Sequence, residues 1–186
     1  MSDDEDYEME DAPTRPRRAR VRSSWLGESD DGIVLEDVTK AVSDGKLEFV
    51  KRHLPRFGPN QRDEQGFNLL LWSIQQNTNW EMLSLLLEAP GLDINLADND
   101  GRTALYWAVE YKLVDVVAKL LSRPNIDPNK ANDDGITPLM LAAKKGLWEI
   151  VDMLCHQPKI KIGQPDKKNQ TALQHLNKQL PPALLT

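Results

Sequence analysis

The sequence contains little that could fix its structure through covalent or metal bonds. It has a single cysteine, Cys155, so an intrachain disulfide is impossible, and this favours a reducing compartment. Its three histidines, His53, His156 and His175, have no metal-ligand spacing among themselves or with the cysteine. We therefore expect no metal site. Because no glycine-rich phosphate loop is present either, we expect no cofactor.

Long hydrophobic runs are also missing. No apolar run approaches the roughly 20 residues that a membrane-spanning helix needs. The first residues are acidic, the opposite of the basic start of a secretory signal peptide. We therefore expect no membrane segment and no signal peptide, and we expect the protein in the cytoplasm, the nucleus or both.

Charge is unevenly distributed along the chain, whose formal net charge is −6. Residues 1–12 hold seven acidic residues and no basic one, and residues 13–22 hold five arginines and no acidic residue. Residues 1–32 are poor in aliphatic residues, and a charged segment of that kind buries too little apolar surface to fold. We predict a disordered tail over residues 1–32 and one folded domain over residues 33–186.

The arginine-rich block has three interpretations. Its members are Arg15, Arg17, Arg18, Arg20 and Arg22. Such a block is typical of a nuclear import signal, of an arm that binds nucleic acid, or of a solvated tail. The neighbouring acidic block and the acidic remainder of the chain disfavour nucleic acid, because binding to phosphates requires positive charge. Ser2, at the head of the acidic run, is a candidate for phosphorylation.

A unit of 34 or 35 residues repeats along the rest of the chain, marked by a glycine at positions 66, 101 and 135. Glycine suits a tight turn because the turn needs a positive φ. Two residues later comes a side chain whose oxygen can cap a helix. These capping residues are Asn68, Thr103, Thr137 and Thr171. Pro138 follows at the first helical position, where a missing N–H costs nothing.

Each unit continues with two short helices joined by a turn. In the first helix the core positions at helical spacing are Leu70/Ser73/Ile74, Leu105/Ala108/Val109 and Leu139/Ala142/Ala143. In the second they are Leu83/Leu86/Leu87, Val117/Leu120/Leu121 and Val151/Leu154/Cys155. Helices this short are not stable alone, so each unit must stack on the next. The turn holds Asn77, Lys112 or Gly146, and we predict a left-handed backbone at Lys112.

The best-preserved unit, GITPLMLAAKKG at residues 135–146 followed by Glu149-Ile150-Val151, resembles the ankyrin repeat. It departs from that pattern at Met140, where the family usually has histidine. The resemblance implies an all-α repeat solenoid over residues 33–186, with about five helix-turn-helix units joined by β-hairpin loops. The first unit lacks its turn and the last is interrupted by Pro181-Pro182, so both are expected to be degenerate caps.

The resemblance also implies a function. Ankyrin repeats usually bind proteins through the concave helix face and the hairpin tips, so we expect a non-catalytic adaptor or regulator that is a monomer. The family's variable positions give these candidate contacts: Phe67, Trp72, Gln75, Gln76, Arg102, Trp107, Glu110, Tyr111, Ile136, Lys144, Lys145 and Lys178. Two interpretations of Trp72 and Trp107 stay open, since they could cover the seam between units or contact a partner.

Two other functions stay open, and catalysis is disfavoured. The acidic start suits an escort for a basic client such as a ribosomal or histone protein, and the arginines suit a basic-arm nucleic-acid binder. The histidines lie in different units, where we expect structural roles.

Five further residues carry expectations of their own. Cys155 occupies an aliphatic position, so we expect it to be buried and inert. We expect Trp80 and Trp148 to pack where the second helices begin. The linker asparagines Asn95 and Asn129 stand where some ankyrin proteins are hydroxylated.

Overall fold

The computed structural model describes residues 32–177. Over that range the chain forms nine α-helices and no β-strand. The helices are α1 (Leu35–Ser43), α2 (Leu47–Phe57), α3 (Leu69–Gln75), α4 (Trp80–Leu87), α5 (Ala104–Glu110), α6 (Val114–Leu121), α7 (Pro138–Lys145), α8 (Trp148–Cys155) and α9 (Ala172–Asn177). Most of the predicted tail, residues 1–31, and the predicted contact Lys178 lie outside the described residues.

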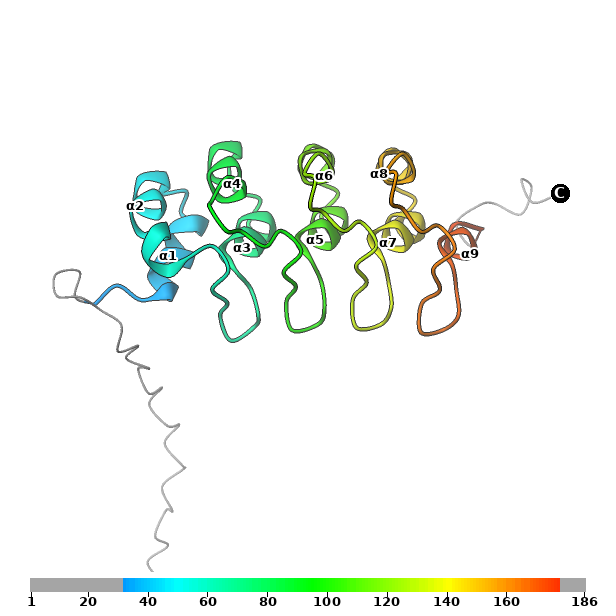
Figure 1. Cartoon of the computed structure of the whole chain (residues 1–186), viewed down its shortest axis with the longest axis horizontal. Coiled ribbons are helices and arrows are strands. Elements are labelled where there is room, and N and C mark those ends of the chain that lie inside the picture. Colours follow the sequence, from blue (N-terminus) through cyan, green and yellow to red (C-terminus); the bar gives the residue numbers. More distant parts are fainter. Residues whose placement is uncertain (1–31, 178–186) are drawn as a thin grey trace, which may run out of the picture. The chain divides into compact units, whose positions relative to one another are not determined.

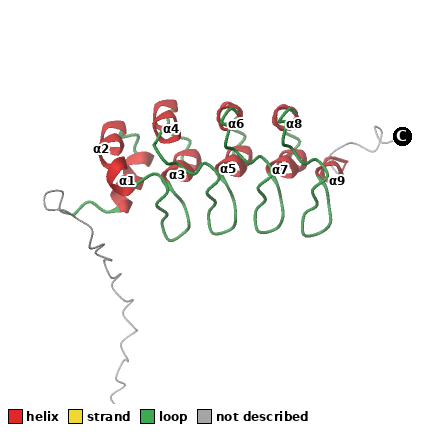
Figure 2. Ribbon diagram, viewed as in Figure 1, coloured by secondary structure: helices red, strands yellow, loops and turns green. Residues whose placement is uncertain are grey.

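The helices form two rows (Figures 1 and 2). The inner row contains α3, α5, α7 and α9, and the outer row contains α2, α4, α6 and α8. Each inner helix packs on the next inner helix, and α1 packs on both α2 and α3. This arrangement confirms the predicted solenoid and its degenerate first unit. The interrupted second helix of the last unit falls outside the described range.

The predicted caps begin the inner helices. The side-chain oxygen of Asn68 accepts a hydrogen bond from the amide of Leu71 at 2.9 Å. Thr103 and Thr137 cap α5 and α7 in the same way. Each cap satisfies one of the amides that the first turn of a helix leaves without an intrahelical partner.

Glycine is required in the hairpins because neighbouring hairpins touch. A Cβ atom on Gly101 would lie 2.7 Å from Oδ1 and 2.9 Å from the amide nitrogen of Asp133 in the next hairpin. The amide of Asp133 donates to the carbonyl of Asp100 at 2.9 Å, so the two hairpins are joined through their backbones. The last unit has Asn169 at this position, also with a positive φ. Asparagine is tolerated there because no further hairpin follows among the described residues.

The buried core follows the predicted helical spacing except in α8. Leu105, Ala108 and Val109 in α5 are fully buried, whereas in α8 Val151 is partly buried and Cys155 is exposed. The equivalent Leu121 is buried, at 7 % exposure. The expectation of a buried Cys155 is therefore wrong, because within the described residues no further outer helix packs on α8.

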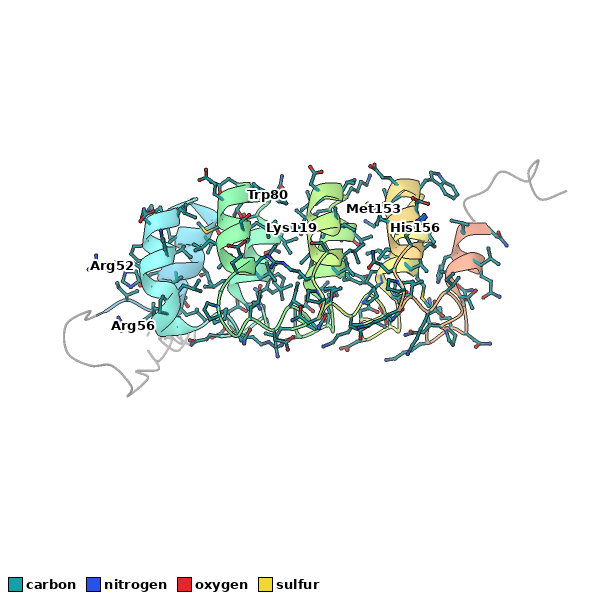
Figure 3. The ribbon with its side chains drawn as sticks, turned by 45° about the horizontal axis from the view of Figure 1, so that its top comes forward. Arg52, Arg56, Trp80, Lys119, Met153 and His156 are labelled. Atoms are coloured by element: carbon teal, nitrogen blue, oxygen red, sulfur yellow. The ribbon has the colours of Figure 1, made fainter. Side chains whose placement is uncertain are left out.

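The two outer-row tryptophans are also more exposed than predicted. Trp80 is 49 % exposed and Trp148 is 53 % exposed, so neither is packed into the core. The ammonium group of Lys119 lies 5.9 Å from the centre of the Trp80 ring, across the groove between α4 and α6 (Figure 3). Two helices of the outer row, α4 and α8, therefore begin with a large aromatic side chain that is about half exposed to solvent.

The backbone at Lys112 is left-handed, with φ of 59°, as the sequence predicts. The equivalent Gly146 has φ of 65° and no steric penalty for it. We expect Lys112→Gly to raise the free energy of unfolding by at most about 1 kcal/mol, because it relieves this strain. The measurement is urea unfolding, with Gly146→Ala as the reciprocal variant that should lower stability. An unchanged or lower midpoint for Lys112→Gly would contradict the argument.

Candidate partner-binding surface

The first residue of each hairpin ties the turn to the following inner helix. These four hairpin residues are Asp63, Asp98, Asn132 and Asp166. In each, Oδ1 accepts two backbone amides of its own turn at 2.8–3.1 Å. In the three aspartates, Oδ2 faces a ring nitrogen nine residues later, at 2.7 Å for Trp72, 3.0 Å for Trp107 and 2.9 Å for His175. One carboxylate therefore fixes both the turn and the helix that follows it.

The fourth unit shows why the hairpin residue varies. The residue nine positions after Asn132 is Leu141, which has no N–H in its side chain to donate. If residue 132 were an aspartate, its second carboxylate oxygen would have no ring N–H to accept from. The residue at this position is instead an asparagine, whose Oδ1 still accepts the two turn amides. This bridge was not predicted from the sequence, although Asp recurs there nine residues before Trp72, Trp107 and His175. The bridge favours the seam-covering interpretation of Trp72 and Trp107.

The Trp107 ring is covered by three side chains. Its centre lies 5.6 Å from the Phe67 ring and 5.4 Å from the stacked Tyr111 ring, and the Arg102 guanidinium lies 4.4 Å from it. Phe67 and Trp107 are 4 % and 9 % exposed. This burial disfavours direct contacts by Phe67 and Trp107, because neighbouring side chains already cover their surfaces. Tyr111 is 41 % exposed and is the accessible aromatic member of this cluster.

Arg102 is already engaged within its own hairpin. Its Nε donates to Oδ2 of Asp98 at 2.8 Å, and its Nη2 pairs with the carboxylate of Asp100. Two paired carboxylates and a stacked indole hold the guanidinium in one orientation. Arg102 is only partly exposed, and it fixes the shape of the surface around Tyr111.

The remaining described candidates differ in exposure, and most lie at the ends of the inner helices. Gln76 and Lys144 are exposed, whereas Trp72, Gln75, Glu110, Ile136 and Lys145 are partly buried. Nζ of Lys145 donates to Oε1 of Glu110 at 2.6 Å, joining the ends of α7 and α5. Along the helix ends the candidates change from neutral or acidic (Gln75, Gln76, Glu110) to basic (Lys144, Lys145), and this ion pair weakens that gradient because two of its charges neutralise each other. Lys144 keeps its charge available to solvent.

The hairpin tips carry a gradient of their own. Glu64, Asp100, Asp133 and Asp134 are exposed at the tips of the first three hairpins, and Lys167 and Lys168 are exposed at the fourth. We define the inner surface as these tips together with Gln76, Tyr111 and Lys144. The inner surface is acidic over three hairpins and basic at the last.

Family models match most of the described chain. The model "Ankyrin repeats (3 copies)" matches residues 38–132, and "Ankyrin repeats (many copies)" matches residues 120–176. The chain belongs to the ankyrin-repeat family. A search of curated proteins finds no match to it. Ankyrin repeats are generally protein–protein interaction modules and are typically non-catalytic, so a protein partner is implied.

The linker asparagines of this ankyrin protein join neighbouring repeats. Nδ2 of Asn95 donates to the carbonyl of Asn125 at 2.8 Å, and its Oδ1 accepts from the amide of Asp127 at 2.8 Å. Asn129 makes the same pair of bonds to residues 159 and 161, and Asn60 makes it to residues 91 and 93. The two positions considered for hydroxylation thus hold adjacent repeats in register.

The histidines have identifiable surroundings in the repeat stack. His53 is buried with its ring centre 4.4 Å from the Phe49 ring, and His175 is buried against Asp166. His156 is exposed, with Nδ1 at 2.8 Å from the carbonyl of Asp152. Within residues 32–177 no group of three or more metal-binding side chains comes together. No helix in that range is long and apolar enough to cross a membrane.

The double role of the hairpin aspartate can be tested at Asp98. We expect Asp98→Asn to lower the free energy of unfolding by about 1–3 kcal/mol, because an amide N–H₂ would face the N–H groups of Trp107 and Arg102. Asn132→Asp is the matched control, since no ring donor awaits its second oxygen, and we expect no gain in stability. Urea unfolding followed by circular dichroism measures both. Equal effects of the two variants would contradict the bridge.

Asp166 predicts how the stability of the last repeat depends on pH. Burial raises the pKa of the Asp166 carboxyl, but hydrogen bonds from the Gln170 amide, the His175 ring and the Lys168 amide outweigh it and hold that pKa below the ordinary value. The charged form is thus favoured in the folded state. Its contribution to stability is present above the unfolded pKa of about 3.9 and is lost as the pH falls through the lower folded pKa.

We therefore expect wild type to exceed Asp166→Asn in stability near neutral pH, and the difference to shrink on acidification below about pH 4. Amide hydrogen exchange of α9 residues reports the local stability at each pH. A difference that stays constant down to strongly acidic pH would contradict the assigned role of the carboxylate.

Proposed function

We propose that the protein is a non-catalytic adaptor or regulator that binds a partner protein through the inner surface. The observation that carries the proposal is the accessible Tyr111, which is stacked on the buried indole of Trp107. Lys144, at the end of the next inner helix, is exposed to solvent. Rigid aromatic side chains lose little conformational entropy on binding and are frequent hot spots. The partner supplies whatever activity is regulated.

The charges of the inner surface favour one orientation of the partner. Acidic tips on the first three hairpins attract basic groups, and the lysines of the last hairpin attract acidic ones. A partner that lies along the stack with its own charges in the opposite order would be steered into that register. Charge steering acts mostly on the association rate and weakens with salt.

The test combines affinity capture with two substitutions. We expect partners captured by the full chain to be captured equally by a protein that begins at Gly32, because the repeats choose them. We expect Tyr111→Ala to weaken binding about tenfold, a loss of about 1.4 kcal/mol, and Lys144→Glu to slow association. Trp148→Ala, an exposed aromatic on the outer row, is the matched control and should bind normally.

Capture that is unchanged in both inner-surface variants would overturn the proposal. Loss of all partners on removal of the first 31 residues would assign recognition to the tail instead.

A second function rests on the acidic hairpin tips together with the acidic segment 1–12. These charges suit an escort for a strongly basic client. If this function is correct, less of the basic client should be captured when residues 1–12 are removed. Unchanged capture after that deletion would contradict the escort function and favour binding through the inner surface.

A further inference from the structure

A small pocket lies between two successive linkers of the stack. Its volume is about 200 Å³, and it is bounded by residues 121–128, from the last residue of α6 into the linker, and by residues 157–159 after α8. Leu121 and Ile126 are buried, and the side chains of Pro124 and Pro158 add apolar walls. The neighbouring His156, at the end of α8, marks this region in Figure 3. The pocket is separate from the inner surface.

Arg123 is the unusual member of this pocket. Its Nε and Nη2 atoms are buried and have no hydrogen-bond partner among residues 32–177. These two nitrogens form one edge of the guanidinium, the edge on which two N–H groups point in parallel. A buried charged donor without a partner is unfavourable, so this edge gains free energy when a ligand brings two acceptors to which it can donate. Two parallel donors match the two oxygens of a carboxylate.

The arginine is not required by the repeat architecture. The equivalent residues of the preceding and following units are Ala89 and Gln157. Ala89 is 9 % exposed, so a methyl group fills that position without a charge. A cation at residue 123 is therefore particular to this one junction between repeats.

The opposite wall of the pocket is held in place and is also basic. Nδ2 of Asn129 donates to the carbonyl of Lys159 at 2.8 Å, and Oδ1 of Asn129 accepts from the amide of Lys161 at 2.7 Å. These bonds hold the two linkers at a fixed separation, so less conformational entropy is lost when a ligand binds between them. The exposed side chain of Lys159 adds a second positive charge at the rim.

We propose that this pocket binds a carboxylate of an acidic segment in a partner protein. On binding, the Arg123 guanidinium turns into the pocket, so that Nε and Nη2, buried in the free chain, donate to the two carboxylate oxygens. Lys159 adds charge attraction at the rim. The apolar walls contact the aliphatic part of the bound residue. The proposal rests on the proposed function only in that the ligand belongs to a protein, since the site lies outside the inner surface.

The experiment is a nuclear magnetic resonance titration of the full chain that follows the Arg123 Nε–Hε signal. The probe is acetyl-Leu-Glu-Leu-amide, whose only charge is the side-chain carboxylate. Acetyl-Leu-Gln-Leu-amide removes that charge, and acetyl-Leu-Gln-Leu with a free carboxyl end moves it to the terminus. These arms distinguish a side-chain carboxylate from a chain terminus, and inorganic phosphate serves as a general anion.

We expect a saturating shift of the Arg123 signal with at least one carboxylate peptide, with a dissociation constant on the order of 1 mM, and none with the uncharged peptide. Arg123→Ala should abolish the accompanying shifts of the Lys159 and Ile126 amides. Arg123→Lys should weaken binding about tenfold, because lysine keeps the charge but loses the paired donors. The matched control is Arg52→Ala, which removes an exposed arginine from α2 and should leave binding unchanged.

Amide spectra confirm that each variant is folded, and Ala89 shows that alanine suits this position. The proposal would be overturned if neither carboxylate peptide shifted the Arg123 Nε–Hε signal. It would also be overturned if the Lys159 and Ile126 amides shifted as much in Arg123→Ala as in the wild type. A stronger response to phosphate than to either carboxylate would overturn the assignment to a carboxylate. Loss of this site would leave partner capture through Tyr111 unaffected, so the two proposals fail independently.

Discussion

Contact between neighbouring repeats is the interaction on which this structure depends. The described helices contain 6–11 residues, too few to be stable alone in water. Their apolar faces are buried only because the next unit covers them, as Leu121 is covered and Cys155 is not. Stability is therefore a sum over junctions, and each junction can be altered with limited effect on the others.

Polar contacts give those junctions their register. Hydrophobic burial is not directional, so it would permit adjacent units to slide or rotate. Linker asparagines bond to the backbone of the following linker, and hairpin amides bond to the preceding hairpin, as between Asp133 and Asp100. The hairpin aspartates then fix each turn to its own helix. The result is a surface whose side chains keep fixed positions before any partner arrives.

The sequence was sufficient to predict the features that are local or periodic. Capping by Asn68, the positive φ of Gly101 and the left-handed Lys112 each follow from a few adjacent residues. Features that depend on what lies across a junction were missed. The burial of Phe67, the pairing of Lys145 with Glu110 and the exposure of Cys155 each depend on neighbours about 30 or more residues away or on the lack of one.

Departures from the repeat pattern carry the most information about function. A repeat that only had to stack could use the same residue at every equivalent position, as the buried leucines nearly do. Arg123 breaks that uniformity in the linkers, where Ala89 shows that a small apolar residue suffices. Lys144 breaks it at the helix ends, where the equivalent residue is Glu110. Neither cation is required for stacking, and the two surfaces that they mark share no residue of the repeat stack. One protein could therefore engage two acidic groups at once, and the spacing between them would be set by the repeats rather than by a flexible linker.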